Sequence, residues 1–163
     1  MPDGRRPSPV RRRVPGELST AEFLRGVLDA TRARLPDPLQ HLETRHQGSL
    51  IKLWRDDPAI HFEMAVHRGR GRVELALHFE TRDAERNRRL LEYVAEDLQL
   101  LKETLGIGVE AEPWDKGWTR VYLTRPVERL GTEEQAALAI AFAEFIEVIE
   151  PIRQEAEHAV DSG

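Results

Sequence analysis

The chain has 163 residues, the size of one domain with a substantial core. It contains no cysteine, which excludes disulfides, thiolate nucleophiles and cysteine-based zinc sites, and it has no apolar stretch long enough for a transmembrane helix. The net charge of −5 is uneven, because residues 1–16 hold five Arg and one Asp while the rest holds 19 basic and 28 acidic side chains. Since the acidic body repels phosphate groups, only the N-terminal segment is suited to nucleic acid.

The first 16 residues also contain four Pro and few apolar side chains, a composition typical of disorder. We therefore expect a disordered tail over 1–16 and a single domain over 17–160. The tail is interpreted as a flexible leader or a misassigned start or, alternatively, as a basic arm that contacts nucleic acid or an acidic partner. Such an arm would use Arg5, Arg6, Arg11, Arg12 and Arg13. No apolar run follows these arginines, so we expect no secretory signal and a cytoplasmic location.

The domain opens with Ser-Thr-Ala-Glu at 19–22, a capping box in which Ser19 caps a helix and Glu22 reaches back. We expect this helix to end at Pro36 and Pro38. Segments of alternating polarity follow, and turn residues separate them. They predict strands at about 40–46, 49–55, 59–67 and 72–80.

The second half of the sequence predicts two more helices and two more strands. Apolar residues at three- and four-residue steps indicate a long amphipathic helix over 82–105, ended by Gly106. Strands are expected at about 108–113 and 118–125, before a closing helix that opens with a capping box at 132–135. The order α-β-β-β-β-α-β-β-α predicts a two-layer α+β fold, in which an antiparallel sheet carries helices packed on one face.

Strand registers chosen for the apolar face also bring complementary charges together on the other face. The pairs expected on this polar face are His41–Trp54, Glu43–Lys52, Lys52–Glu63, Trp54–His61, His61–His78, Glu110–Tyr122, Glu112–Arg120 and Trp114–Trp118. All three Trp then lie on the polar face and all five Phe on the core side. Trp and Tyr tolerate half-wet surfaces and are enriched at interfaces.

The polar face is therefore predicted to be an open aromatic surface for a protein partner. Its expected partner-binding residues are His41, Trp54, His61, His78, Trp114, Trp118 and Tyr122. The alternative is that a helix, or long Arg and Glu side chains, cover this face. His61, Glu63 and His78 also offer a zinc-type ligand set. Because their spacing matches no known motif, solvated or partner-facing histidines are favoured over a metal, and we expect no cofactor.

Two resemblances accompany these patterns. Residues 20–155, with Arg-Val-Glu-Leu-Ala-Leu-His-Phe-Glu-Thr at 72–81, a charged helix, a Trp-bearing hairpin and a closing helix, resemble an uncharacterised bacterial domain family sometimes encoded with restriction–modification components. That family has no settled catalytic residues, so the resemblance implies no site. The element order is also similar to the type III secretion chaperone-like fold, which implies a dimeric, acidic, non-enzymatic protein that binds extended peptides.

The sequence shows no nucleophile elbow and no phosphate-binding loop, so it favours a non-enzymatic protein without catalytic residues. We predict a cytoplasmic protein-interaction module, chaperone-like or an accessory subunit, that does not bind membranes. The closing helix is apolar over more than one stripe, which favours a homodimer. The alternative functions are a nucleic-acid-associated accessory protein that uses the tail and, less favoured, a metal-dependent enzyme at His61 and His78.

Overall fold

The computed structural model describes residues 15–163, so the five tail arginines and the interpretation given to them lie outside the described residues. In chain order the elements are α1 (Thr20–Arg34), α2 (Asp37–Gln40), β1 (Glu43–Gln47), β2 (Leu50–Trp54), β3 (Ile60–His67), the 3-10 turn η1 (Arg68–Arg70), β4 (Arg72–Phe79), α3 (Ala84–Ala95), α4 (Leu98–Leu105), β5 (Glu110–Pro113), β6 (Thr119–Pro126) and α5 (Thr132–Asp161).

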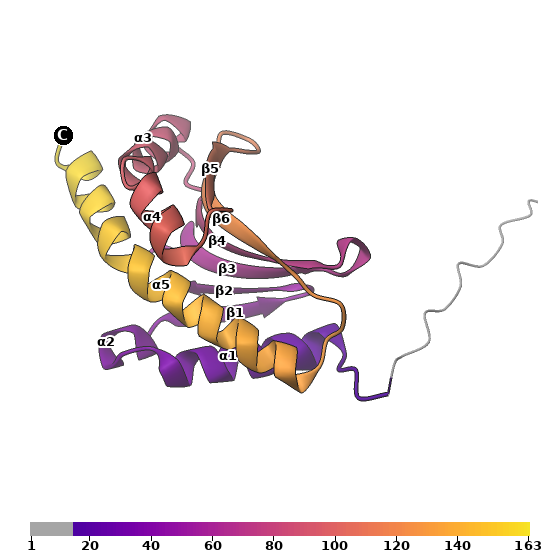
Figure 1. Ribbon diagram of the computed structural model, residues 1–163. Helices are drawn as coiled ribbons and strands as arrows, with labels where there is room; N and C mark the ends of the chain where they lie inside the picture. The colour runs from indigo at the N-terminus through magenta and orange to yellow at the C-terminus, as the bar shows by residue number, and fades with distance from the viewer. Residues whose placement is uncertain (1–14) are drawn as a thin grey trace, which may run out of the picture.

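The strands form one antiparallel sheet in the order β1-β2-β3-β4-β6-β5, with helices packed on one face. Helices α1 and α5 run side by side along the sheet, and α3 and α4 cover its β5–β6 end (Figure 1). The predicted α+β class is confirmed. No helix in residues 15–163 combines the length and apolar character needed to cross a membrane.

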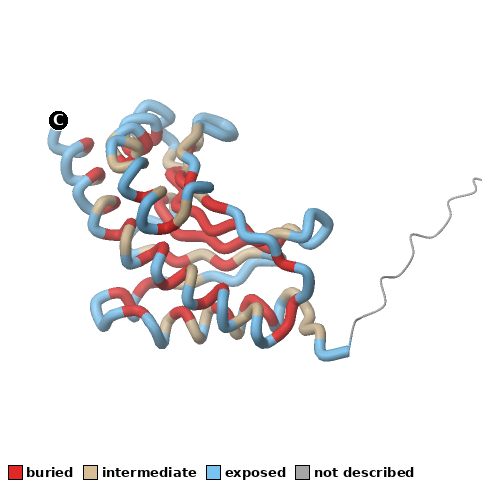
Figure 2. Tube along the Cα trace, viewed as in Figure 1, coloured by how far each residue is buried: buried red, intermediate tan, exposed pale blue. Residues whose placement is uncertain are grey.

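The core lies between the sheet and the helices. All five Phe are buried there, as the sequence predicts, and the rings of Phe62 on β3 and Phe145 on α5 meet edge to face at 6.3 Å. Burial also extends to both faces of β3 and β4, whose residues are buried almost throughout (Figure 2). A sheet with one fully wet face would instead show alternating burial along these strands.

Most predicted registers are confirmed. His61 pairs with His78 and Lys52 with Glu63, and in the last hairpin Glu112 pairs with Arg120. Short connections of four or five residues join these strands and leave few alternative registers compatible with a single apolar face.

The first hairpin differs from the prediction by two residues. Thr44, not Leu42, lies opposite Leu53, so Glu43 lies opposite Trp54 and Arg45 opposite Lys52. The turn residues are Gly48 and Ser49, and Gly48 takes a left-handed φ of 58° that glycine adopts without steric cost. The predicted His41–Trp54 and Glu43–Lys52 pairs are therefore wrong.

The helices also depart from the sequence pattern at two places. The predicted 82–105 helix is interrupted at Glu96 and Asp97, where Asp97 has non-helical backbone angles and begins α4. The closing helix is capped by Gly131 without a side-chain hydrogen bond, so the predicted capping box does not form. At α1 the cap is confirmed, because Ser19 Oγ accepts a hydrogen bond from the Glu22 amide at 3.1 Å.

Candidate functional site

The sheet face opposite the helices, here called the helix-free face, carries polar side chains, and those at its centre are buried. One row of cross-strand neighbours on this face contains Glu43, Trp54, His61, His78, Arg120 and Glu112. The next row contains Arg45, Lys52, Glu63, Ala76, Tyr122 and Glu110. Only 1% of His61, 2% of His78 and 8% of Glu63 is exposed. The chain therefore buries this cluster by itself, and partner binding at the predicted residues stays a prediction.

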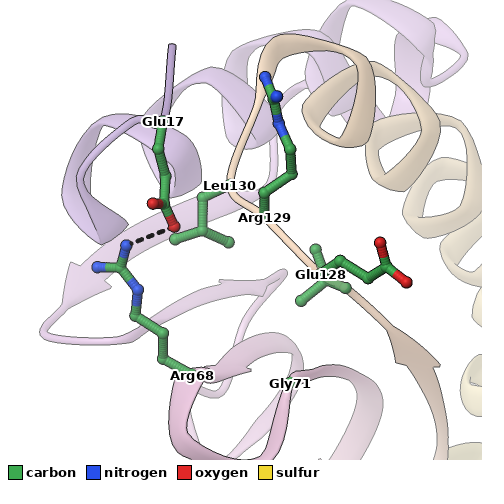
Figure 3. Close-up of a pocket in the computed structure, with 7 residues that line it drawn as sticks. Glu17, Arg68, Gly71, Glu128, Arg129 and Leu130 are labelled. Atoms are coloured by element: carbon green, nitrogen blue, oxygen red, sulfur yellow. Dashed lines mark hydrogen bonds and ion pairs between the residues drawn. The ribbon is translucent and has the colours of Figure 1, made fainter. Parts of the chain in front are cut away.

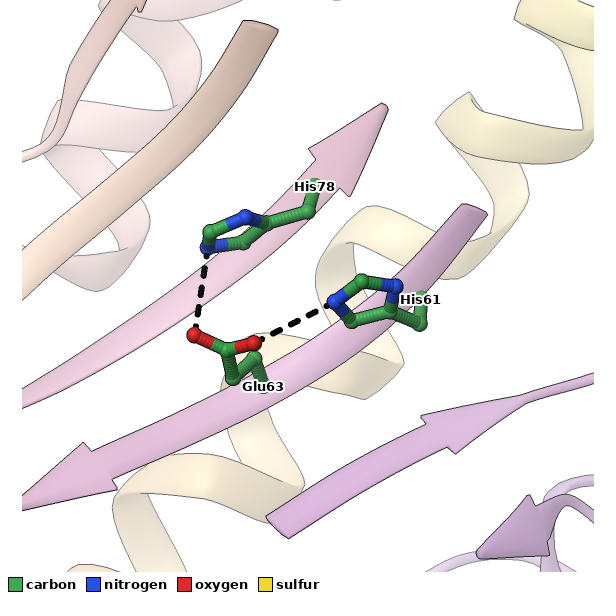
Figure 4. Close-up of side chains that lie close together, drawn as sticks. All are labelled: His61, Glu63 and His78. Atoms are coloured by element: carbon green, nitrogen blue, oxygen red, sulfur yellow. Dashed lines mark hydrogen bonds and ion pairs between the residues drawn. The ribbon is translucent and has the colours of Figure 1, made fainter. Parts of the chain in front are cut away.

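His61, Glu63 and His78 form one cluster, in which both imidazoles approach the same carboxylate (Figure 4). His61 Nε2 lies 3.3 Å from Glu63 Oε1, and His78 Nε2 lies 3.5 Å from Glu63 Oε2. The two rings stack with centroids 5.2 Å apart. The cluster is pre-ordered, because all three side chains project from the paired strands β3 and β4.

Each imidazole is also held at its other nitrogen. The Pro58 carbonyl oxygen lies 2.9 Å from His61 Nδ1, and the Glu80 carboxylate lies 3.0 Å from His78 Nδ1. Sequence analysis did not identify either partner, although Glu80 follows His78 by two residues and so shares its strand face.

The carboxylates in this cluster favour their ionised form. Burial raises the pKa of Glu63, but the hydrogen bond with His61 and the charge of His78 outweigh burial and hold that pKa below its usual value. At Glu80 burial likewise raises the pKa, and the hydrogen bond with His78 brings it below the usual value. The charge of Lys52 lowers the pKa of both carboxyl groups further.

The β5–β6 end of the helix-free face is aromatic and more open. We call Trp114, Trp118, Arg120 and Tyr122 the hairpin end. The Trp114 ring meets the His78 ring edge to face at 5.3 Å and the Trp118 ring at 5.9 Å. The Arg120 guanidinium lies over Tyr122 at 4.0 Å and over Trp114 at 5.1 Å.

Arg120 also connects the hairpin end to neighbouring strands through charge. It forms ion pairs at 2.8 Å with Glu74 on β4 and with Glu112 on β5. Stacking and pairing together fix this guanidinium, so the aromatic side chains around it are held in place without a helix above them.

Asn87 on α3 holds the β5–β6 hairpin through hydrogen bonds, and sequence analysis did not identify this residue. Its amide nitrogen donates to the carbonyl oxygens of Gly117 and Thr81, both at 3.0 Å. Gly117 has a left-handed φ of 79°, and a Cβ there would lie 2.7 Å from that of Ala84. Only glycine satisfies both the turn and the close helix approach, so α3 fixes the turn between the two tryptophans of the Trp-Asp-Lys-Gly-Trp segment.

The remaining predicted residues lie at the other end of the face. Trp54 is partly buried on β2, with the Arg45 guanidinium 5.9 Å from its ring centroid. His41 is exposed in the turn after α2 and does not pair with a strand residue. The predicted surface is thus divided into the hairpin end, a buried histidine centre and the Trp54 end.

A separate small hollow lies beside the β3–β4 turn, where Arg68 forms a 2.8 Å ion pair with Glu17 (Figure 3). Its volume is about 30 Å³, which is space for a water molecule but not for a metabolite. Its lining residues are Glu17, Arg68, Gly71, Val127, Glu128, Arg129 and Leu130.

These features define an α+β protein with a helix-free sheet face. No protein-family model matches the sequence. No curated protein matches it either. A chain in the solved structure of the HopA1-SchA chaperone-effector complex is similar over 83% of this chain and 96% of that chain, with 19% identity and a TM-score of 0.43. The function proposed below depends on the site alone.

Proposed function

We propose that this chain is a protein-interaction module that binds a partner through the hairpin end of the helix-free face. The observation that carries the proposal is Trp114, which is 44% exposed although its ring is held by His78, Trp118 and Arg120. Tryptophan is the residue type most enriched at energetic centres of interfaces. A ring that is already fixed loses little conformational entropy when a partner covers it.

The surroundings of Trp114 favour an extended segment as the partner's binding element. Strand β5 is at the edge of the sheet, so its outer backbone groups pair with no strand in residues 15–163. An extended peptide can add to such an edge through main-chain hydrogen bonds. Glu110 is exposed and Glu112 partly so on this strand, which favours basic side chains in the segment beside an apolar one that covers Trp114.

The experiment compares the chain with a matched pair of variants as bait in a lysate of the source organism. Trp114→Ala removes the proposed anchor, while Ile107→Ala removes another exposed apolar side chain, 87% exposed before β5. A bound protein should be retained by the wild type and by Ile107→Ala. With Trp114→Ala its affinity should fall by at least about tenfold, because losing an interface Trp costs about 2 kcal/mol or more.

Hydrogen exchange then locates the interface. In the complex, amide protection should increase over residues 110–118. Equal retention by the two variants, or protection confined to other elements, would contradict the proposal. Trp54→Ala reports whether the partner spans the whole face, as the sequence predicts: a loss of affinity there, in addition to that at Trp114, would extend the interface to the Trp54 end.

A further inference from the structure

In the buried cluster of His61, Glu63 and His78, neutral imidazoles would have no hydrogen atom to donate to the Glu63 carboxylate. The Pro58 carbonyl can only accept, so His61 Nδ1 must be the donor in that contact. The ionised Glu80 carboxylate likewise requires the proton of His78 on Nδ1. In a neutral ring the second nitrogen, Nε2, then carries a lone pair and no hydrogen.

Both of these lone pairs point at an acceptor. Glu63 presents its two carboxylate oxygens to the two Nε2 atoms, at 3.3 and 3.5 Å, and His78 Nε2 is buried without a hydrogen-bond partner. Three acceptors facing one another in a buried site require a cation among them. The cation is either a proton on each imidazole or one metal ion shared by all three groups.

We propose that His61 Nε2, His78 Nε2 and a Glu63 carboxylate oxygen bind a divalent transition metal ion, with Zn²⁺ the best match. Two imidazoles and a carboxylate are an established zinc ligand type. Metal–ligand bonds of about 2.0–2.1 Å in a tetrahedral site separate neighbouring ligand atoms by about 3.3 Å. His61 Nε2 lies at that separation from Glu63 Oε1, at 3.3 Å, and His78 Nε2 lies 3.5 Å from the other oxygen of the same carboxylate. One ligand atom from each residue lies within 4.8 Å of the other two (Figure 4).

The second set of contacts supports the same assignment. A metal-binding histidine commonly donates its other ring N–H to a carbonyl or a carboxylate, which fixes the tautomer and aims the free nitrogen at the metal. Pro58 and Glu80 supply one group of each kind. The carboxylates of Glu63 and Glu80 balance the charge of a divalent ion, and the charge of Lys52, which lies opposite Glu63, opposes it.

The site is independent of the proposed partner surface but adjoins it, because the Trp114 ring packs edge-on against His78. The three ligands occupy three positions of a tetrahedral ion. The fourth position remains for water or for a side chain of a partner, as at zinc sites with three protein ligands. An ion here would fix β3 and β4 together below the hairpin end.

The test uses the untagged full-length chain, stripped with EDTA and dialysed, and titrated with Zn²⁺ by calorimetry and with Co²⁺ by visible absorption. We expect one ion per chain, intense Co²⁺ bands of a tetrahedral site and a higher Tm with Zn²⁺. His78→Ala should weaken Zn²⁺ binding by at least about 100-fold, and Glu80→Gln by about 10–100-fold through loss of the orienting contact. His41→Ala and His46→Ala, at exposed histidines, should bind as the wild type does.

The wild-type measurement decides the proposal even if a ligand variant fails to fold. Absence of one-equivalent Zn²⁺ binding by the stripped wild type overturns it and leaves protonated imidazoles as the buried cations. Binding that survives in folded His78→Ala and Glu80→Gln, or that is lost in His41→Ala or His46→Ala, overturns it as well. Circular dichroism of each variant separates loss of metal binding from loss of fold.

Discussion

Glu63 occupies the centre of the helix-free face, with an imidazole at each carboxylate oxygen. In the metal-free protein, with a proton on each imidazole, Glu63→Ala should lower the free energy of unfolding by about 1–3 kcal/mol, because it leaves two buried N–H groups without an acceptor. Glu43→Ala, at the exposed edge of the same face, should cost less than about 0.5 kcal/mol. Urea unfolding in EDTA measures both. Equal costs would mean that the cluster contributes nothing to stability.

Alternation of polar and apolar residues predicts which face a side chain occupies but not how deeply it is buried. His61 and His78 were placed on the correct face and pair, since tight turns fix the register of β3 and β4. Burial depends instead on tertiary contacts, such as the Trp114 ring that meets the His78 ring edge to face. A two-residue shift leaves every face unchanged, so alternation could not exclude the wrong register at His41.

Among the helices, α3 packs against the β5–β6 hairpin and supports its turn through Asn87. Asn87→Ala removes the donor that satisfies the Gly117 carbonyl and the acceptor that satisfies the Thr81 amide. We expect a loss of at least about 2 kcal/mol in unfolding free energy, because buried unsatisfied groups cost about 1–3 kcal/mol each. Amide exchange at Gly117 and Trp118 should also accelerate.

The matched control on the same helix is Arg88→Ala, whose ion pairs with Glu85 and Glu92 are exposed. It should cost less than about 1 kcal/mol, since exposed ion pairs contribute little. If the two variants are equally stable, Asn87 does not support the hairpin. From sequence, Asn87 was hidden because a polar residue within an apolar helical stripe gives no indication of the backbone groups it will satisfy.

For the whole molecule, packing within one chain buries most of the apolar surface of α5 from which the sequence predicts a homodimer. It packs against α1, α3 and α4, and residues such as Phe142, Phe145 and Ile149 are buried within one chain. What remains exposed centres on Ile140, at 47%. A hollow of about 250 Å³ next to this surface is lined by Arg125, Pro126, Val127, Glu134, Ala137, Leu138 and Ala141.

The homodimer remains a prediction, with Ile140 as the residue that tests it. Light scattering at micromolar concentration should give twice the chain mass of 18.7 kDa for the wild type. Ile140→Asp should give 18.7 kDa, because a carboxylate at an apolar interface is costly to desolvate. Ile107→Asp, at an exposed residue outside α5, should leave the dimer intact. A wild-type mass of 18.7 kDa would exclude the dimer at that concentration.

The strand order has a kinetic consequence. Strands β1 to β4 follow one another through short turns, whereas β6 pairs with β4 only after α3, α4 and β5 have been placed between them. Closing that long segment costs entropy when β4 pairs with β6, so we expect this pairing to form late in folding. The hairpin end is then the last part of the sheet to assemble, and in pulse-labelled refolding β3 amides should become protected before those of β6.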